Sequence, residues 1–109
     1  MSDPHPVLRD LGRFSEPALL ILVSLADAPK HGYAMLEDIE VLAGVRLGPG
    51  TLYGALARLE RLGLIEPLPA DQRRRPYRLT QAGANALRAE LASWHKLAST
   101  GLRRLAVSA

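Results

Sequence analysis

An apolar stripe along the last quarter of the chain is the feature that most restricts the possible folds. After Thr80, a suitable N-cap residue, apolar side chains recur in steps of four, three, four, four and three residues, which is the spacing of one face of an α-helix. The stripe consists of Leu87, Leu91, Trp94, Ala98, Leu102 and Leu105. One subunit of 109 residues has too little core to cover so long a helix, so we expect a second copy to cover it. The alternative for Trp94 is packing on the first helix of its own subunit.

Two helices are predicted in the first half of the chain. The first opens at Ser15, a good N-cap residue, carries Pro17 in its first turn and is apolar on nearly every side, which predicts that it is buried. The second begins near residues 31–33 and stops at Gly44. Its inner face has three apolar residues at helical spacing, Met35, Ile39 and Leu42.

A third helix and a hairpin are predicted between Gly44 and Thr80. The helix runs over residues 49–63, and its inner stripe consists of Leu52, Leu56 and Leu59. Residues 64–68 and 73–79 predict two short strands joined by a turn over 69–72. The order of three helices, a hairpin and a long helix is typical of a mostly α, winged helix-turn-helix domain, with a two-stranded wing and an added C-terminal helix. We therefore expect a flexible N-terminal arm over 1–10, the DNA-binding domain over 11–80, and a dimerisation helix and tail over 81–109.

The charge is distributed unevenly along the chain. Residues 1–45 hold three basic and seven acidic side chains, whereas residues 46–109 hold eleven basic and four acidic ones, and the net charge is +3. A basic second half suggests a polyanionic partner such as nucleic acid, although charge alone is equally consistent with a well-solvated basic surface.

The outward face of the predicted third helix is the candidate base-reading surface. It has small residues near its start and Thr, Tyr and Arg around them, and short side chains there allow a helix to approach the bases of a major groove. The residues of this face are Gly50, Thr51, Tyr53, Gly54, Ala57, Arg58 and Arg61. Two alternatives stay open, because Tyr53 can instead pack against the second helix and Thr51 can instead cap its own helix.

A basic run lies at the tip of the predicted hairpin. Guanidinium groups bind phosphate and are attracted by the potential of a narrow minor groove. The candidate wing contacts to DNA are Arg73, Arg74, Arg75 and Arg78. A charge run is often only a solvated loop, but its position beside the third helix favours DNA.

Several function classes lack the residues they need. The chain has no cysteine, which excludes a disulfide scaffold, a thiolate nucleophile and a cysteine-based zinc finger. His5, His31 and His95 do not have metal-ligand spacing, and Glu37, Asp38 and Glu40 share the solvated face of one helix. The run Ala18–Val23 is too short to span a bilayer. We therefore expect no catalytic residues, no metal, no cofactor and no membrane contact, and a cytoplasmic location.

Several motifs in a fixed order carry a family resemblance. They are His31-Gly32-Tyr33, Gly50-Thr51-Leu52-Tyr53, Leu56, Arg58-Leu59-Glu60, Gly63-Leu64-Ile65, Arg73-Arg74-Arg75, Tyr77-Arg78-Leu79-Thr80 and Gly83. Together, over residues 17 to 90, they resemble the PadR family of bacterial repressors, and the short C-terminus resembles the smaller subfamily. Gly54 stands where the family often has proline, Pro76 where it usually has an aromatic residue, and no glycine precedes the arginine run.

The resemblance implies a homodimeric repressor of transcription on an inverted-repeat operator, often with ATGT and ACAT half-sites. Some members bind flat aromatic compounds at the dimer interface, which makes Trp94 the candidate contact for a small aromatic effector. The alternative from a different class is a winged-helix module that docks onto proteins without touching DNA.

Overall fold

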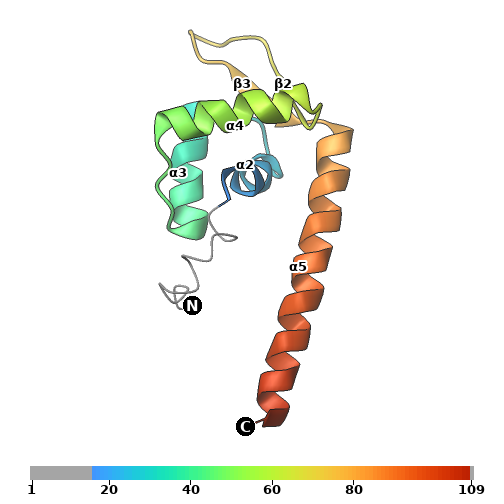
Figure 1. Ribbon diagram of the computed structural model, residues 1–109. Helices are drawn as coiled ribbons and strands as arrows, with labels where there is room; N and C mark the ends of the chain where they lie inside the picture. The colour runs from blue at the N-terminus through green and yellow to red at the C-terminus, as the bar shows by residue number, and fades with distance from the viewer. Residues whose placement is uncertain (1–15, 109) are drawn as a thin grey trace.

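The computed structural model describes residues 16–108, and everything below refers to them. The expected arm over residues 1–10 and the expected N-cap Ser15 lie outside this range. Helix α2 (Pro17–Leu25) starts one residue later than predicted, with Glu16 at the N-cap and Pro17 at the first helical position. Its residues are apolar nearly all round, and Leu20, Ile21, Leu22, Ser24 and Leu25 are buried. Figure 1 shows α2 surrounded by the other helices, so it is the centre of the core.

Helix α3 (Gly32–Ala43) begins and ends as predicted. The Nδ1 atom of His31, the N-cap residue, accepts a hydrogen bond from the Ala34 backbone N–H, and Gly44 ends the helix with a φ of 66°, in the left-handed region that favours glycine. Met35 and Ile39 are fully buried. The prediction that Leu42 belongs to the same buried face is wrong, because its side chain is 52% exposed in the last turn of α3.

Helix α4 (Pro49–Arg61) packs its predicted stripe completely into the core. Leu52, Leu56 and Leu59 are no more than 3% exposed, and α4 contacts both α2 and α3. Gly63 follows the helix with a φ of 74° and lets the chain reverse directly into strand β2 (Ile65–Pro67). The outward face of α4 is thereby held at one end of the molecule, away from α2 (Figure 1).

The sheet has one strand more than the sequence predicted. Strand β3 (Pro76–Leu79) lies between β2 and the two-residue strand β1 (Lys30–His31), and both pairings are antiparallel. Lys30 pairs with Tyr77 and His31 with Pro76. The return strand is also shorter than expected, since it starts at Pro76 and leaves the arginine run in the connection. We call the hairpin over residues 65–79 the wing.

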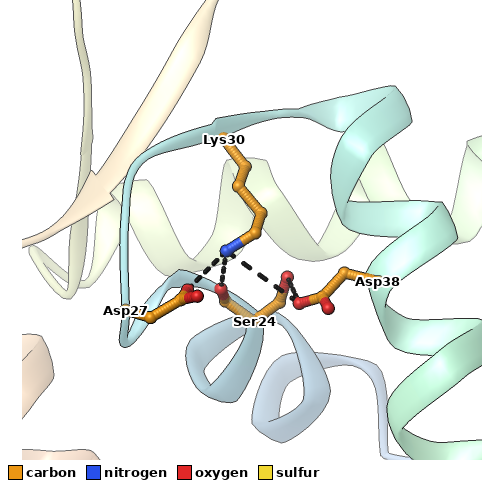
Figure 2. Close-up of polar contacts among 4 residues, drawn as sticks. All are labelled: Ser24, Asp27, Lys30 and Asp38. Carbon is orange, nitrogen blue, oxygen red and sulfur yellow. Dashed lines mark hydrogen bonds and ion pairs between the residues drawn. The ribbon is translucent and has the colours of Figure 1, made fainter.

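A polar cluster fixes β1 to the helices. The ammonium group of Lys30 donates hydrogen bonds to the Ser24 carbonyl and to Asp27, and lies 3.9 Å from Asp38 Oδ2 (Figure 2). The Ser24 hydroxyl donates to the same Asp38 oxygen at 2.7 Å. The Lys30 ammonium, through its hydrogen bond and its charge, holds the pKa of Asp27 below its ordinary value. The cluster therefore connects the end of α2, the edge strand and α3.

The first turns of helix α5 (Gln81–Ser108) anchor it to the domain. Thr80 caps it as predicted, because its hydroxyl accepts a hydrogen bond from the Gly83 backbone N–H at 3.0 Å and donates one to the Gly63 carbonyl at 2.6 Å. A Cβ atom on Gly83 would lie 1.9 Å from the Leu64 carbonyl oxygen, so only glycine fits there. The rest of the 28-residue helix runs past α2 and away from the domain, which gives the molecule a length of 55 Å (Figure 1).

Candidate nucleic-acid interface

All seven residues predicted to face a major groove lie on the exposed side of α4. They are Gly50, Thr51, Tyr53, Gly54, Ala57, Arg58 and Arg61. A Cβ atom built on Gly50 or Gly54 would meet nothing within 4 Å, so both glycines border open space. No side chain caps the N-terminus of α4, so the alternative that Thr51 caps its own helix is wrong. The first turn of α4 thus presents small residues and uncapped backbone N–H groups at the surface.

Tyr53 both packs against α3 and reaches the surface. Its side chain is 54% exposed, yet a Cβ atom on Gly32 would lie 2.5 Å from the Tyr53 hydroxyl and 3.0 Å from Cζ. The two interpretations left open for Tyr53 are therefore compatible. The contact explains why glycine stands first in α3, because any larger residue would displace the Tyr53 ring.

The tip of the wing is a two-residue turn. The backbone N–H of Asp71 donates to the Arg74 carbonyl at 2.7 Å, and the Arg74 N–H donates to the Asp71 carbonyl at 2.9 Å. The two central residues, Gln72 and Arg73, have φ values of 49° and 70°. Positive φ at both central positions is the signature of a type I′ turn, whose twist matches that of a hairpin. The turn places Arg73, Arg74 and Arg75 at the exposed end of the wing.

The arginines of these two surfaces differ in whether a carboxylate neutralises them. Arg78 does have a partner, since its Nε donates to Glu66 Oε1 at 2.6 Å and its Nη2 lies 2.5 Å from the same oxygen. Within residues 16–108, by contrast, no ion pair involves Arg58, Arg61, Arg73, Arg74 or Arg75. These five guanidinium groups are available to phosphates, whereas Arg78 must first leave Glu66.

One residue of this region was not assigned a role at the surface. The sequence indicates only that a helix begins near His31, and the hydrogen bond from the Ala34 N–H to its Nδ1 is that of an N-cap residue. Its other ring nitrogen, Nε2, lies 3.3 Å from Arg74 Nη1. The two residues are 43 positions apart and meet because β1 pairs with β3, so the unpredicted third strand brings them together.

The stripe of α5 divides into a covered and an exposed part. Leu87 is 5% exposed and belongs to the core of its own subunit, so it leaves almost no area for a partner. Leu91 is 42% exposed, Leu102 and Leu105 are each 69% exposed, and Ala98 is exposed as well. Leu97, which lies beside the stripe and was not predicted as a contact, is 68% exposed.

Trp94 is half-buried, although its neighbours on the stripe, Leu91 and Ala98, are both exposed. It lines an open hollow of about 290 Å³ between α2, the end of α4 and α5. Leu19 and Leu22 of α2 and Leu59 and Leu62 line the same hollow, and so does Arg58 from the exposed side of α4. On one side Trp94 therefore faces α2 and the end of α4 of its own subunit.

The described residues lack the features of two other classes of site. Within residues 16–108, no cluster of three or more His, Asp or Glu side chains has the geometry of a metal site. Among the same residues, no helix combines the length and apolar character that crossing a membrane requires.

Comparison with known proteins places the chain among transcriptional regulators. Residues 21–89 match the "Transcriptional regulator PadR-like family". An uncharacterised 37.1 kDa protein in transposon TN4556 of Streptomyces fradiae is 49% identical over 85 residues, which cover 78% of this chain and 25% of that protein. The chain thus spans about a quarter of the length of that relative. Transcriptional regulator Rv3488 of Mycobacterium tuberculosis is 41% identical over 83 residues, which cover 73% of this chain and 77% of that protein.

A solved structure shows the same architecture. The PadR family transcriptional regulator of Eggerthella lenta superposes with a TM-score of 0.70 at 30% identity, over 91% of this chain and 85% of that one. Members of this family are transcriptional regulators and not enzymes. The matched segment contains the second half of α2, all of α3, α4 and the wing, and the anchored start of α5, and it covers more than half of the sequence. The chain belongs to the PadR-like family of transcriptional regulators.

Proposed function

We propose that the protein binds double-stranded DNA sequence-specifically and acts as a homodimeric repressor at an inverted-repeat operator. The observation that carries this proposal is the combination of an exposed, small-sided α4 with arginines that no carboxylate neutralises. The outward face of α4 and the wing lie at the same end of the molecule (Figure 1). A major groove admits one helix, and arginines beside that helix can bind the flanking phosphates.

Each part of the surface has a separate role in this proposal. The first turn of α4 enters the major groove, where Gly50 and Gly54 leave room for the bases and Thr51 and Tyr53 offer hydroxyl groups. Arg58 and Arg61 reach phosphates or guanine edges. The wing arginines lie along the phosphate backbone or in the adjacent minor groove, where the potential attracts guanidinium groups. Occupation of the operator blocks RNA polymerase.

The homodimer is proposed from the exposed part of the α5 stripe. Apolar side chains such as Leu91, Leu102 and Leu105 stay largely in contact with water in one subunit, and a two-fold partner offers the same stripe to cover them. In this arrangement residues 81–109 are the dimerisation segment. Two-fold symmetry of the protein implies two-fold symmetry of the binding site, which is the reason for an inverted repeat.

A small aromatic effector is a further part of the proposal. The hollow beside Trp94 offers an indole surface for stacking, and Arg58 in its lining belongs to the DNA-facing helix. A ligand there would link occupancy of the hollow to the position of α4. Titration with a phenolic acid, 4-hydroxycinnamate, should quench the fluorescence of Trp94, the one tryptophan of the sequence. Unchanged emission up to millimolar ligand would contradict this part alone.

Selection of bound duplexes from a random pool tests the proposed function directly. Enrichment of a symmetric sequence is expected. A Gly54→Leu variant should lose that preference while keeping its circular dichroism spectrum, because the added side chain extends into open space at the groove and not into the core. A pool that shows no enrichment, together with no salt-dependent retention on a DNA column, would favour a protein-docking module instead.

The contribution of the wing to DNA binding can be tested by its salt dependence. Replacing Arg73, Arg74 and Arg75 with Ala should weaken binding to all sequences alike, and each lost phosphate contact should reduce the slope of log K against log salt by about 0.9. Arg78→Ala is the matched control, since Glu66 already neutralises Arg78, and its slope should change less. Equal slopes for the wild type and the triple variant would show that the wing does not touch DNA.

A further inference from the structure

The two contacts of His31 require opposite tautomers of its neutral ring, and the cap of α3 selects one of them. A neutral imidazole has one nitrogen that donates and one that accepts. Nδ1 accepts from the Ala34 backbone N–H at 3.4 Å, as the N-cap of α3, so the hydrogen belongs on Nε2. The neighbour of Nε2 is Arg74 Nη1, at 3.3 Å. A guanidinium nitrogen can only donate. In the tautomer that caps α3, two N–H donors therefore stand side by side at the surface.

We propose that His31 Nε2 and the Arg74 guanidinium together bind one phosphate of the DNA backbone. An oxygen placed between two adjacent donors accepts from both, and a negatively charged oxygen does so most strongly. Neither side chain makes an ion pair within residues 16–108, so no carboxylate described there occupies this position. This inference rests on the proposed DNA binding and adds a third element, the start of α3, to the surface formed by α4 and the wing.

The location of the pair favours a DNA phosphate as the bound anion. Arg74 is adjacent to the exposed Arg73 and Arg75, and Gly32, next to His31, lies against Tyr53 of the groove-facing helix. The pair thus lies between the two surfaces that the proposed function assigns to DNA. A backbone passing from α4 to the wing would cross it.

Separating the two contacts of His31 requires a variant that keeps one of them. In His31→Asn the side-chain oxygen can still cap α3, because asparagine is a good N-cap residue, but the shorter side chain has no donor beside Arg74. Binding of the full-length protein to a fluorescein-labelled duplex of mixed sequence should weaken about tenfold for each subunit, as expected for one charge-assisted hydrogen bond. The salt slope should stay close to that of the wild type, because a neutral imidazole releases no counterion and Arg74 still neutralises the phosphate. His95→Asn, a matched change on the exposed surface of α5, should leave both values unchanged.

A double-mutant cycle tests whether the two residues share one phosphate. If they do, His31→Asn combined with Arg74→Ala should weaken binding no further than Arg74→Ala alone, whereas the losses of affinity for His31→Asn and Arg73→Ala should add. Additivity between His31 and Arg74, or an unchanged affinity in His31→Asn, would overturn the proposal. If wild-type protein does not bind the duplex at all, the proposed function itself fails.

Nitrogen NMR of the wild-type imidazole provides a test that does not depend on a variant. The ring should carry its hydrogen on Nε2 in the unbound protein, and this resonance should shift when the duplex is added. A hydrogen on Nδ1 would contradict the two-donor arrangement. Inorganic phosphate is titrated separately, and a shift with inorganic phosphate but none with the duplex would assign the site to a soluble anion and overturn its role in DNA binding.

Discussion

Helices α4 and α5 both carry a regular apolar stripe, but the subunit covers the two stripes very differently. Leu52, Leu56 and Leu59 of α4 are almost completely buried, whereas on α5 only Leu87 reaches that level and Leu102 remains 69% exposed. A helical period shows which face of a helix is apolar, but it does not show what covers that face. Under the proposed function the two helices have different partners, DNA for the outward face of α4 and a second copy of the chain for the stripe of α5.

One substitution on each helix tests this difference, and the substitution in α4 has the largest expected effect on stability. Leu56→Ala should lower the free energy of unfolding by about 2–5 kcal/mol, because it opens a cavity in a closed core. That loss should be the same at every protein concentration. Leu102→Ala should show a smaller loss that grows with concentration, since a contact between subunits stabilises only the dimer. Urea unfolding over a hundredfold dilution series distinguishes the two, and a Leu102 effect independent of concentration would mean that the subunit covers this residue itself.

A second pair of variants compares the two ends of α5. Gly83→Ala forces a Cβ atom onto the Leu64 carbonyl, and we expect it to cost about 1–3 kcal/mol or more through displacement of the helix start. The loss should appear in thermal unfolding followed by circular dichroism. Wild-type stability in this variant would show that α5 can shift on the domain without penalty.

Gly101→Ala should change the free energy of unfolding in the opposite direction, towards greater stability. No atom lies within 4 Å of a Cβ atom at this position in the subunit, and alanine in place of glycine inside a helix stabilises by about 0.5–1 kcal/mol. Thermal unfolding again provides the measurement. A destabilised Gly101→Ala variant would indicate that a second copy packs directly against this glycine, which would locate the closest approach of the two helices.

The features that the sequence predicted correctly depend on neighbours in the chain. The stripe of α4, the stop at Gly44 and the cap at Thr80 follow from spacing and from local hydrogen bonds, and the fold class follows from their order. The features it missed depend on residues far apart. Strand β1 has two residues and no periodicity, and it exists because Lys30 and His31 meet β3.

The candidate site shows the same division. The exposed face of α4 was predictable because the opposite face had to be buried. The neutralisation of Arg78 by Glu66, by contrast, depends on the register of β2 and β3, and the contact of His31 with Arg74 depends on the third strand. Leu42 was misassigned because its spacing matches the buried stripe while the packing around the last turn of α3 does not cover it.

The smallest expected effect on stability comes from the polar contact between Asp27 and Lys30, which holds β1. The core of α4, by contrast, is held by apolar contacts. The pKa of Asp27 is lowered in the folded state by its hydrogen bond with Lys30. A lowered folded pKa means that the pair stabilises the protein above the pKa of the unfolded chain and loses this contribution as the pH falls through the folded value. Asp27→Asn should therefore be slightly less stable at neutral pH and lose less stability on acidification. Parallel pH profiles of urea unfolding for the two proteins would contradict this.

The type I′ turn at the tip of the wing has a consequence for how the chain can vary. Gln72 and Arg73 adopt backbone conformations that asparagine and glycine adopt easily and that cost residues with a Cβ atom on the order of 1 kcal/mol each. A sequence chosen for ease of hairpin formation would therefore have neither residue there. The chain instead keeps a long cationic side chain at this position and tolerates a less favourable backbone. The wing therefore combines a less favourable backbone with a charged tip, and stabilising the turn with asparagine and glycine at its two central positions would remove Arg73.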